Sequence, residues 1–207
     1  MNFDEKIKQL HLERQLKLED LPQVDLYMDQ VIQLFQNVYG ETLRNDSEKV
    51  LTKTMINNYS KGKLLFPIQN KKYTNEHLIL MSFIYQLKGG LSISDIKTSL
   101  DEINEKVIEQ YEFPLTSIYE TYLKLVDKNV EIFKQNVLQS VDEVSHEINQ
   151  LEGIHLESME KFLLLSSLVN MSNMYRRLAE SLIDDMKKEE NYLSYTRDCV
   201  DRIDKSR

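Results

Sequence analysis

The stretch Thr52-Lys-Thr-Met-Ile-Asn-Asn-Tyr-Ser-Lys-Gly-Lys-Leu-Leu-Phe-Pro67 decides the fold that we expect for this chain. At about 100° per residue, one side of a helix over residues 52–61 carries the apolar side chains Met55, Ile56 and Tyr59. The other side carries the polar side chains Lys53, Thr54, Asn57 and Lys61. We therefore predict a short helix that packs through one face, exposes a basic face, and ends at Gly62 in a left-handed cap.

The residues after this helix predict a small β hairpin, or wing. Pro67 cannot lie inside a helix, and it favours an extended conformation for Phe66 before it. Residues 64–73 then form two extended arms around a turn, and Lys71 and Lys72 lie at that turn.

Further helices are expected on both sides of the hairpin. Residues 3–18 predict an N-terminal helix, and Asp25 can cap a second helix that stops near Gly40. Thr74 can cap the helix after the hairpin, and the capping-box pattern of residues 92–95 starts one more, short helix. The order helix, short helix, hairpin, helix, capped helix is that of a winged helix-turn-helix, whose second helix enters the major groove of DNA.

The C-terminal half has a different pattern. From residue 122 to residue 151, apolar residues recur every three or four positions, which predicts one long amphipathic helix. A second long helix, at about residues 156–192, can lie antiparallel against it after a break at Gly153. The stripe over residues 122–151 is expected to form a dimer seam or the floor of an effector cavity, or to pack only against its neighbouring helix.

Composition favours a mainly α protein of the cytoplasm. Hydrophobic residues make up 41% of 207, whereas the five glycines and three prolines are too few for the turns of an all-β fold. The lone Cys199 cannot form an intramolecular disulfide, and the N-terminus lacks the pattern of a signal peptide. No apolar stretch is long enough to span a membrane. We expect an N-terminal helix in residues 1–20, a winged-helix domain in residues 21–112, and an α-helical hairpin or bundle in residues 113–207.

Charge is distributed unevenly along the chain. The net charge is −8, yet between residues 49 and 97 eight lysines face two acidic residues, Glu76 and Asp95, a local balance of +6. Such a basic island is typical of a surface that binds an anionic partner, and a solvated lysine face is the alternative. Asn can bond bidentately to adenine, Lys can reach guanine or phosphate, and Thr can contact the thymine methyl group. The expected DNA-binding residues are Lys53, Thr54, Asn57, Asn58 and Lys61, with Lys71 and Lys72 of the wing on the DNA backbone.

Three segments carry a resemblance to a known family. They are residues 52–67, then Lys72-Tyr73-Thr74-Asn-Glu-His-Leu78, then Gln86-Leu87-Lys-Gly-Gly-Leu91-Ser92-Ile-Ser-Asp95-Ile96. Together they resemble the DNA-binding domain of MerR-type regulators, with Asn57 and Asn58 in place of the family's Arg and Tyr, a shorter wing, and a longer link between the first two helices. The whole front half is also similar to a domain of unknown function in low-GC Gram-positive bacteria, whose members are regarded as candidate transcriptional regulators.

Catalytic and metal chemistry have weaker signals. Glu143-Val-Ser-His146 and Glu152-Gly-Ile-His155 have the Glu-x-x-His form of di-iron bundles, but those motifs must come from facing helices and these lie nine residues apart. We interpret them as ordinary surface residues, Cys199 as a bystander, and His77 as a partner of its local helix. We expect no enzyme activity, no cofactor, no metal and no catalytic residue.

These observations predict a sequence-specific DNA-binding transcriptional regulator. The partners that we expect are double-stranded DNA, a second copy in a homodimer, and an unidentified small-molecule effector, with no membrane. A dimer would bind a palindromic operator with A·T-rich half-sites and repress by steric block. The alternative is an adaptor that does not bind DNA and uses the winged helix for protein contacts.

Overall fold

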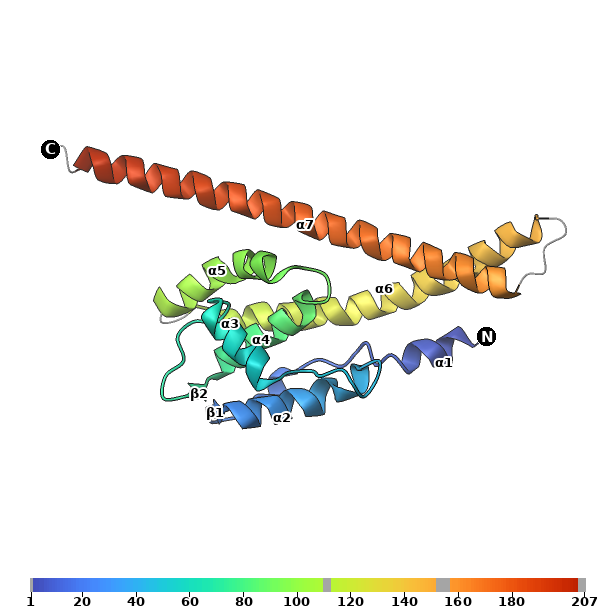
Figure 1. The fold of residues 1–207 in the computed structure, drawn as a ribbon, viewed down its shortest axis with the longest axis horizontal. Coiled ribbons are helices and arrows are strands. Elements are labelled where there is room, and N and C mark those ends of the chain that lie inside the picture. Colours follow the sequence, from blue (N-terminus) through green and yellow to red (C-terminus); the bar gives the residue numbers. More distant parts are fainter. Residues whose placement is uncertain (1, 110–112, 152–156, 205–207) are drawn as a thin grey trace.

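The computed structural model describes residues 2–109, 113–151 and 157–204. Within them the fold is mainly helical, with a small two-stranded antiparallel sheet (Figure 1). Compact helices of the first half lie to one side of two long helices, α6 (Leu115–Asn149) and α7 (Glu157–Asp204). None of the helices in the described residues combines the length and the apolar character that a membrane crossing requires.

The N-terminal segment is less helical than expected. The first helix, α1 (Phe3–Lys8), begins at the cap Asn2, whose side chain accepts from the backbone of Glu5, and ends well before Pro22. Beyond it the chain turns at His11, which has a positive φ of 49°. A short 3-10 turn, η1 (Leu18–Asp20), follows. The expectation of one helix over residues 3–18 is therefore wrong, because Leu16 is fully buried among other elements and its backbone bonds to their side chains.

The sheet pairs segments that are far apart in sequence. Strand β1 (Leu26–Tyr27) runs antiparallel to β2 (Lys72–Tyr73), with Leu26 opposite Tyr73. The expected hairpin within residues 64–73 is reduced to a single bridge between Gln69 and Lys72, because β2 takes its partner from the start of the domain. As a result Tyr27 rather than Asp25 precedes the second helix, and its N–H donates to the Gln30 side chain at 2.9 Å.

The helices of the front half follow the apolar spacing. Helix α2 (Met28–Tyr39) ends at Gly40 as predicted, before the 3-10 turn η2 (Gly40–Thr42) and α3 (Lys53–Lys61). Helix α4 (Asn75–Leu87) has Thr74 at its cap position and is buried over most of its length. Helix α5 (Ile93–Glu109) begins in the predicted capping box but continues nine residues past Leu100, because its apolar face meets α7 and the loop after α3.

The hydrophobic core extends past both expected domain boundaries. Leu16, from the N-terminal segment, and Leu115 and Tyr119, from α6, are buried in the same cluster as the front helices. The rings of Phe83, Tyr119 and Tyr122 pack on one another where α4 meets α6. The first turns of α6 are thus part of the front core.

The long helices meet as a crossed pair. Helix α6 starts at Leu115, seven residues before the expected stripe, and at 1.5 Å per residue its 35 residues span about 50 Å. Its apolar stripe faces α1, α4 and α7 of its own chain, with Val137 and Ile148 buried. Helix α7 is longer than the expected residues 156–192 and runs to Asp204. The break at Gly153 lies outside the described residues.

Candidate nucleic-acid interface

Helix α3 divides into a packed face and an exposed face. Thr52 caps it by accepting the N–H of Met55 at 3.2 Å, and Ile56 and Tyr59 are buried in the core. The exposed face carries all five polar residues that the sequence singles out: Lys53, Thr54, Asn57, Asn58 and Lys61. An anionic partner that approaches α3 from solvent therefore meets amides, a hydroxyl and ammonium groups.

One of these lysines already has an acidic neighbour. The Nζ atom of Lys53 lies 2.7 Å from Oδ1 of Asp29 in the first turn of α2. Both side chains are largely exposed, at 64% and 75%, so the pair adds little to stability. It holds the Lys53 ammonium at the junction of α2 and α3, where a new partner must displace Asp29.

The C-terminal end of α3 corrects one detail of the expectation. Gly62 is in the right-handed helical region, and the left-handed residue is Lys63, with φ of 58°. Gly62 is needed for space instead, because a Cβ atom there would lie 2.8 Å from Cδ1 of Leu64 and 3.1 Å from the carbonyl oxygen of Asn58. The N–H of Leu64 closes the helix on the carbonyl of Tyr59 at 2.9 Å.

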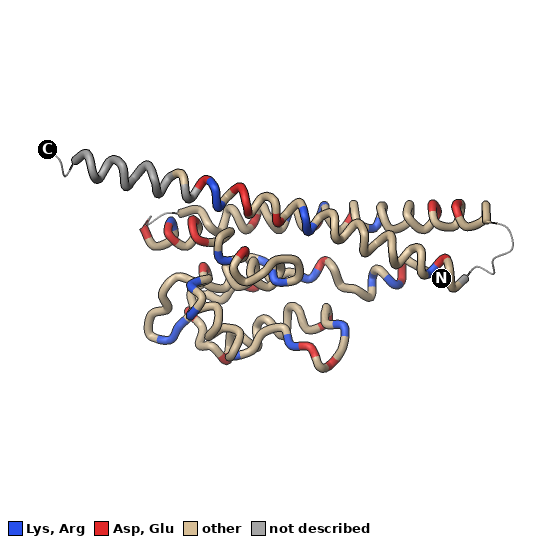
Figure 2. The backbone as a smooth tube through the Cα atoms, turned by 45° about the horizontal axis from the view of Figure 1, so that its top comes forward, with Lys and Arg blue, Asp and Glu red and all other residues tan. Residues whose placement is uncertain are grey.

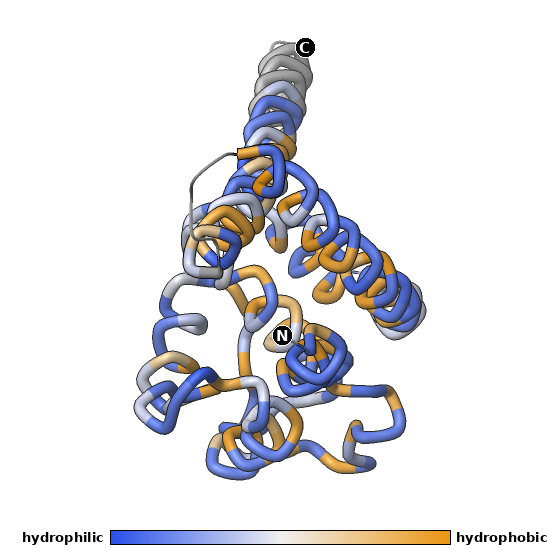
Figure 3. The backbone as a smooth tube through the Cα atoms, turned by 90° about the vertical axis from the view of Figure 1, so that its right-hand side faces the viewer, coloured by the Kyte–Doolittle hydropathy of each residue, from blue (hydrophilic) through white to orange (hydrophobic). Residues whose placement is uncertain are grey.

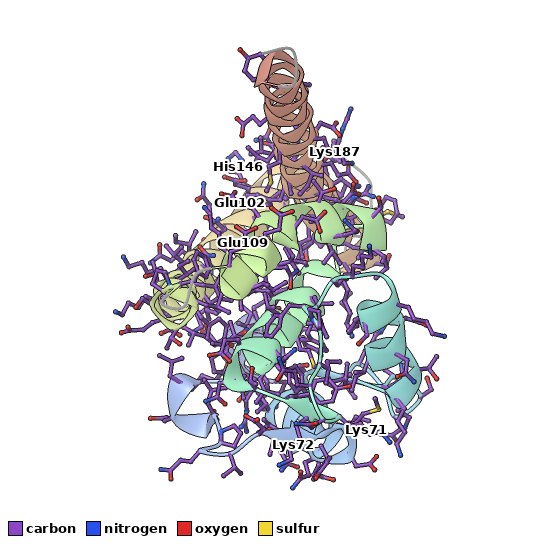
Figure 4. All side chains as sticks on the ribbon, turned by 90° about the vertical axis from the view of Figure 1, so that its left-hand side faces the viewer. Lys71, Lys72, Glu102, Glu109, His146 and Lys187 are labelled. Carbon is purple, nitrogen blue, oxygen red and sulfur yellow. The ribbon has the colours of Figure 1, made fainter. Side chains whose placement is uncertain are left out.

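The turn before β2 presents the two remaining lysines. Asn70 and Lys71 both have positive φ, 51° and 58°, and the N–H of Lys72 donates to the carbonyl of Gln69 at 2.9 Å. This is the pattern of a type I′ turn, in which Asn followed by Gly is preferred. Lys71 is exposed, and the Lys72 ammonium lies 5.5 Å from the ring centroid of Tyr27. Figure 4 looks along the molecule and shows both lysines on the side opposite Lys187.

Only some of the lysines between residues 49 and 97 lie on one exposed surface. Lys88 points inward, donating to the carbonyl of Val50 at 3.1 Å, and burial lowers the pKa of its ammonium. Lys97 pairs with Asp101 on α5 at 2.5 Å. The lysines left on the α3 side are those at positions 49, 53, 61, 63, 71 and 72. Figure 2 shows the basic positions (blue) along the loop between α3 and β2.

Two buried side chains hold this loop in place. His77 Nδ1 accepts the N–H of Thr74 at 3.2 Å, and Nε2 lies 3.3 Å from the carbonyl oxygen of Phe66. Burial lowers the pKa of His77, which fits the predicted role as a partner of its local helix. Asn104 of α5, 7% exposed, donates to the carbonyl of Leu64 at 3.1 Å.

Sequence reasoning missed Asn104, Asp29 and Lys63. Asn104 lies four residues after Leu100 and so on the same face of α5. An amide at this position of an apolar face is the sequence signal that could have identified it. Asp29 and Lys53 are 24 positions apart, so no local spacing joins them. Lys63 was missed because the sequence analysis assigned the left-handed conformation to the preceding Gly62.

The residues considered for metal or redox chemistry do not gather. In the parts of the chain that the structure describes, no group of three or more His, Cys, Asp or Glu side chains could hold a metal ion. His146 is exposed on α6 beside Glu147, and Glu143 bonds to Gln139. Glu152 and His155 lie outside the described residues, as does the side chain of Cys199.

Comparison with known proteins identifies a family for this chain but assigns no function to that family. A family model described as a domain of unknown function, DUF1836, matches residues 16–122, just over half of the 207 residues. No curated protein and no solved structure matches the chain.

Proposed function

The chain belongs to the DUF1836 family, whose defining domain has no assigned function. We propose that it is a sequence-specific DNA-binding transcriptional regulator. In this proposal α2 and α3 form the helix-turn-helix of a MerR-like domain, with α3 in the major groove. The turn over residues 69–72 acts as the wing on the adjacent backbone. The protein acts as a dimer that represses by blocking its operator.

The observation that carries the proposal is the chemistry of the exposed face of α3. Every residue on it has a hydrogen-bond donor, and Asn57 and Asn58 can read adenine in the major groove. The backbone around it supports the same function. Lys63 and Lys71 occupy left-handed conformations that cost an L-residue about 1–2 kcal/mol. Strain kept at charged, exposed positions is typical of functional sites.

The direct test is fluorescence anisotropy on short duplexes tiled across the promoter of the protein's own gene, with random duplex as competitor at two salt concentrations. We expect saturable binding that survives the competitor and a salt slope of about −0.9 per phosphate contacted. Binding no tighter than to random DNA would contradict the proposal.

A double variant locates the contacts. Lys53→Ala with Asn57→Ala should lower specific affinity on the order of 10- to 100-fold while leaving helical content unchanged. Lys128→Ala with Asn149→Ala, the same two residue types exposed on α6, should leave the affinity as it is. Equal affinities for both double variants would remove α3 from the interface. An adaptor would lose nothing, because it has no DNA affinity.

A further inference from the structure

Helix α3 buries little of its own surface. The structure describes all nine of its residues, and two of them, Ile56 and Tyr59, are buried. An isolated helix shorter than about 12 residues is marginal in water, so α3 depends on contacts with the rest of the fold. Figure 3 and Figure 4, two opposite views along the molecule, show α3 at the outer edge of the front helices. The direction of its exposed face therefore depends on how its two flanks are held.

The chain enters and leaves α3 through buried apolar pairs. Val50 and Leu51 directly precede the cap Thr52, and both are buried. Leu64 and Leu65, which follow the end of the helix, are buried as well. A backbone carbonyl group carried into an apolar interior needs a hydrogen-bond donor. Side chains of two other helices supply one donor to each flank.

Lys88 supplies the donor before α3. It is the C-cap residue of α4, and its Nζ atom donates to the carbonyl oxygen of Val50 at 3.1 Å. The same ammonium group lies 4.3 Å from the ring centroid of Tyr85. The Tyr85 hydroxyl in turn lies 3.3 Å from the hydroxyl of Thr42, in the turn after α2. The ammonium group of Lys88 is thus held between α4 and the segment that leads into α3.

Asn104 supplies the donor after α3. Its Nδ2 atom donates to the carbonyl oxygen of Leu64 at 3.1 Å and to that of Leu100, in its own helix, at 3.0 Å. Its Oδ1 atom is one of two buried side-chain polar atoms that lack a hydrogen-bond partner in the residues that the structure describes. A buried amide with an unpaired oxygen costs free energy that a leucine side chain would not. Stability alone therefore does not account for an asparagine at this position.

The bond from Asn104 holds a turn that presents a lysine. The N–H groups of Lys63 and Leu64 donate to the carbonyls of Ser60 and Tyr59, at 3.2 Å and 2.9 Å. This is the Schellman pattern, which ends a helix at a left-handed residue. Lys63 is that residue, with φ of 58°, and the Leu64 carbonyl that Asn104 holds comes directly after it.

Helix α5 provides a fixed base for this bond. Its residues Ile96 and Leu100 are buried in the core. In its first turn, Asp95 accepts the hydroxyl of Ser92 at 2.7 Å and pairs with Lys187 of α7 at 2.9 Å. A side chain on α5 can therefore transmit the position of the core to the end of α3.

We propose that Lys88 and Asn104 are positioning residues for α3. They hold the backbone carbonyls on its two flanks and so orient its exposed polar face, and they do not contact DNA themselves. Two points of attachment, one at each end, oppose both tilting and rotation of the helix. The inference rests on the proposed function for its purpose, because side chains that read bases must be held within about 0.5 Å of their productive geometry.

Hydrogen exchange of the free protein tests the attachment without DNA. Lys88→Met and Asn104→Leu each remove a donor and nearly keep the volume of the side chain. In each variant we expect the amides of α3 to exchange on the order of 10-fold faster, while the amides in the middle of α4 keep their wild-type rates. Lys128→Met and Asn149→Leu, at exposed positions of α6, should leave α3 unchanged. A variant whose α3 exchanges at the wild-type rate would overturn the role of its residue.

DNA binding at several salt concentrations separates positioning from contact. Lys88→Met and Asn104→Leu should each lower specific affinity about 10-fold and keep the wild-type salt slope, because neither side chain reaches a phosphate. Lys88→Arg keeps a donor for the Val50 carbonyl and should restore most of the affinity. A salt slope reduced by about 0.9 in Lys88→Met would make Lys88 a phosphate contact and would overturn its positioning role.

The two measurements let each proposal fail alone. A wild-type chain that binds no duplex specifically would overturn the proposed function, and the exchange rates would still decide whether Lys88 and Asn104 hold α3. If the wild type binds specifically and both variants bind as tightly, the positioning role is overturned while the DNA-binding proposal stands.

Discussion

The hydroxyl of Tyr119 donates a hydrogen bond of 2.6 Å to the carbonyl oxygen of Leu16, a residue 103 positions earlier in the chain. The N–H of Leu16 donates in turn to the hydroxyl of Tyr39 at 3.2 Å. The N–H and the carbonyl of Leu16 therefore hold the N-terminal segment between α2 and α6. Burial raises the pKa of both tyrosines, so each hydroxyl stays protonated at neutral pH.

Tyr119→Phe should therefore destabilise the protein. It leaves the buried carbonyl of Leu16 without this donor, which costs about 1–3 kcal/mol. The free energy of unfolding in urea measures the loss. Tyr175→Phe removes the same hydroxyl from a side chain that is 64% exposed, and it should change stability by less than about 0.5 kcal/mol. Equal stabilities of the two variants would show that the bond to Leu16 contributes nothing.

His77 should make the fold sensitive to acid. Burial lowers the pKa of His77 below its ordinary value of about 6.5, so the unfolded chain binds more protons between that value and the lower folded pKa. Stability should then fall as pH decreases from about 6.5 through this window, and His77 should add no pH dependence above it. Protonation also removes the Nδ1 acceptor for the N–H of Thr74.

Urea midpoints at about pH 7.5 and about pH 5.5 measure this effect. His77→Gln should reduce the difference between the two midpoints, because glutamine can accept the Thr74 bond without titrating. His146→Gln, at a side chain that is 74% exposed, should keep the wild-type difference. An unchanged difference in His77→Gln would assign the acid sensitivity to other groups.

The local sequence pattern predicted the positions of the helices better than it predicted which segments contact one another. The apolar spacing located α2, α3, α4 and most of α6, because each buries a face at helical period. It failed where tertiary contacts compete with local preference, as at Leu16, whose buried backbone interrupts the expected N-terminal helix. It also placed β2 in a hairpin, because spacing cannot show that Tyr73 pairs with Leu26, 47 positions away.

The sequence predicted which residue types form the candidate interface, but not which neighbours those residues contact. The two faces of α3 follow from periodicity alone, and the structure keeps them. Pairing of Lys53 with Asp29 and burial of Lys88 depend on how helices meet, which one segment of sequence does not encode. The sequence placed Lys71 and Lys72 at a turn but contained no sign that Lys71 is held at positive φ.

Asp29→Ala should strengthen DNA binding. Lys53 must leave Asp29 to contact DNA, and removing the carboxylate both frees the ammonium and lowers repulsion from phosphate. We expect a several-fold gain in affinity at low salt that shrinks as salt rises, with little change in stability because the pair is exposed. Glu120→Ala breaks a comparable pair with Lys124 on α6 and should leave affinity unchanged. Weaker binding by Asp29→Ala would mean that Asp29 positions Lys53 for its contact.

Lys63→Gly and Lys71→Gly should each stabilise the fold and weaken DNA binding. Glycine removes the cost of a left-handed L-residue but adds conformational entropy to the unfolded chain, which leaves a net gain of about 0.5–1 kcal/mol. Loss of one ammonium should reduce the salt slope of DNA binding by about 0.9 per variant. Urea unfolding and anisotropy on one duplex at several salt concentrations measure the two effects.

Two controls separate backbone strain from charge. Asn70→Gly changes the neighbouring left-handed position, at φ of 51°, without removing a charge; because Asn already tolerates this conformation, the change should leave both the stability and the salt slope nearly unchanged. Lys71→Ala removes the charge and keeps the strain, so it should lower the slope without a gain in stability. If Lys71→Gly stabilises the fold and binds DNA like the wild type, the strained lysine has no part in DNA contact, and the wing loses its place in the interface.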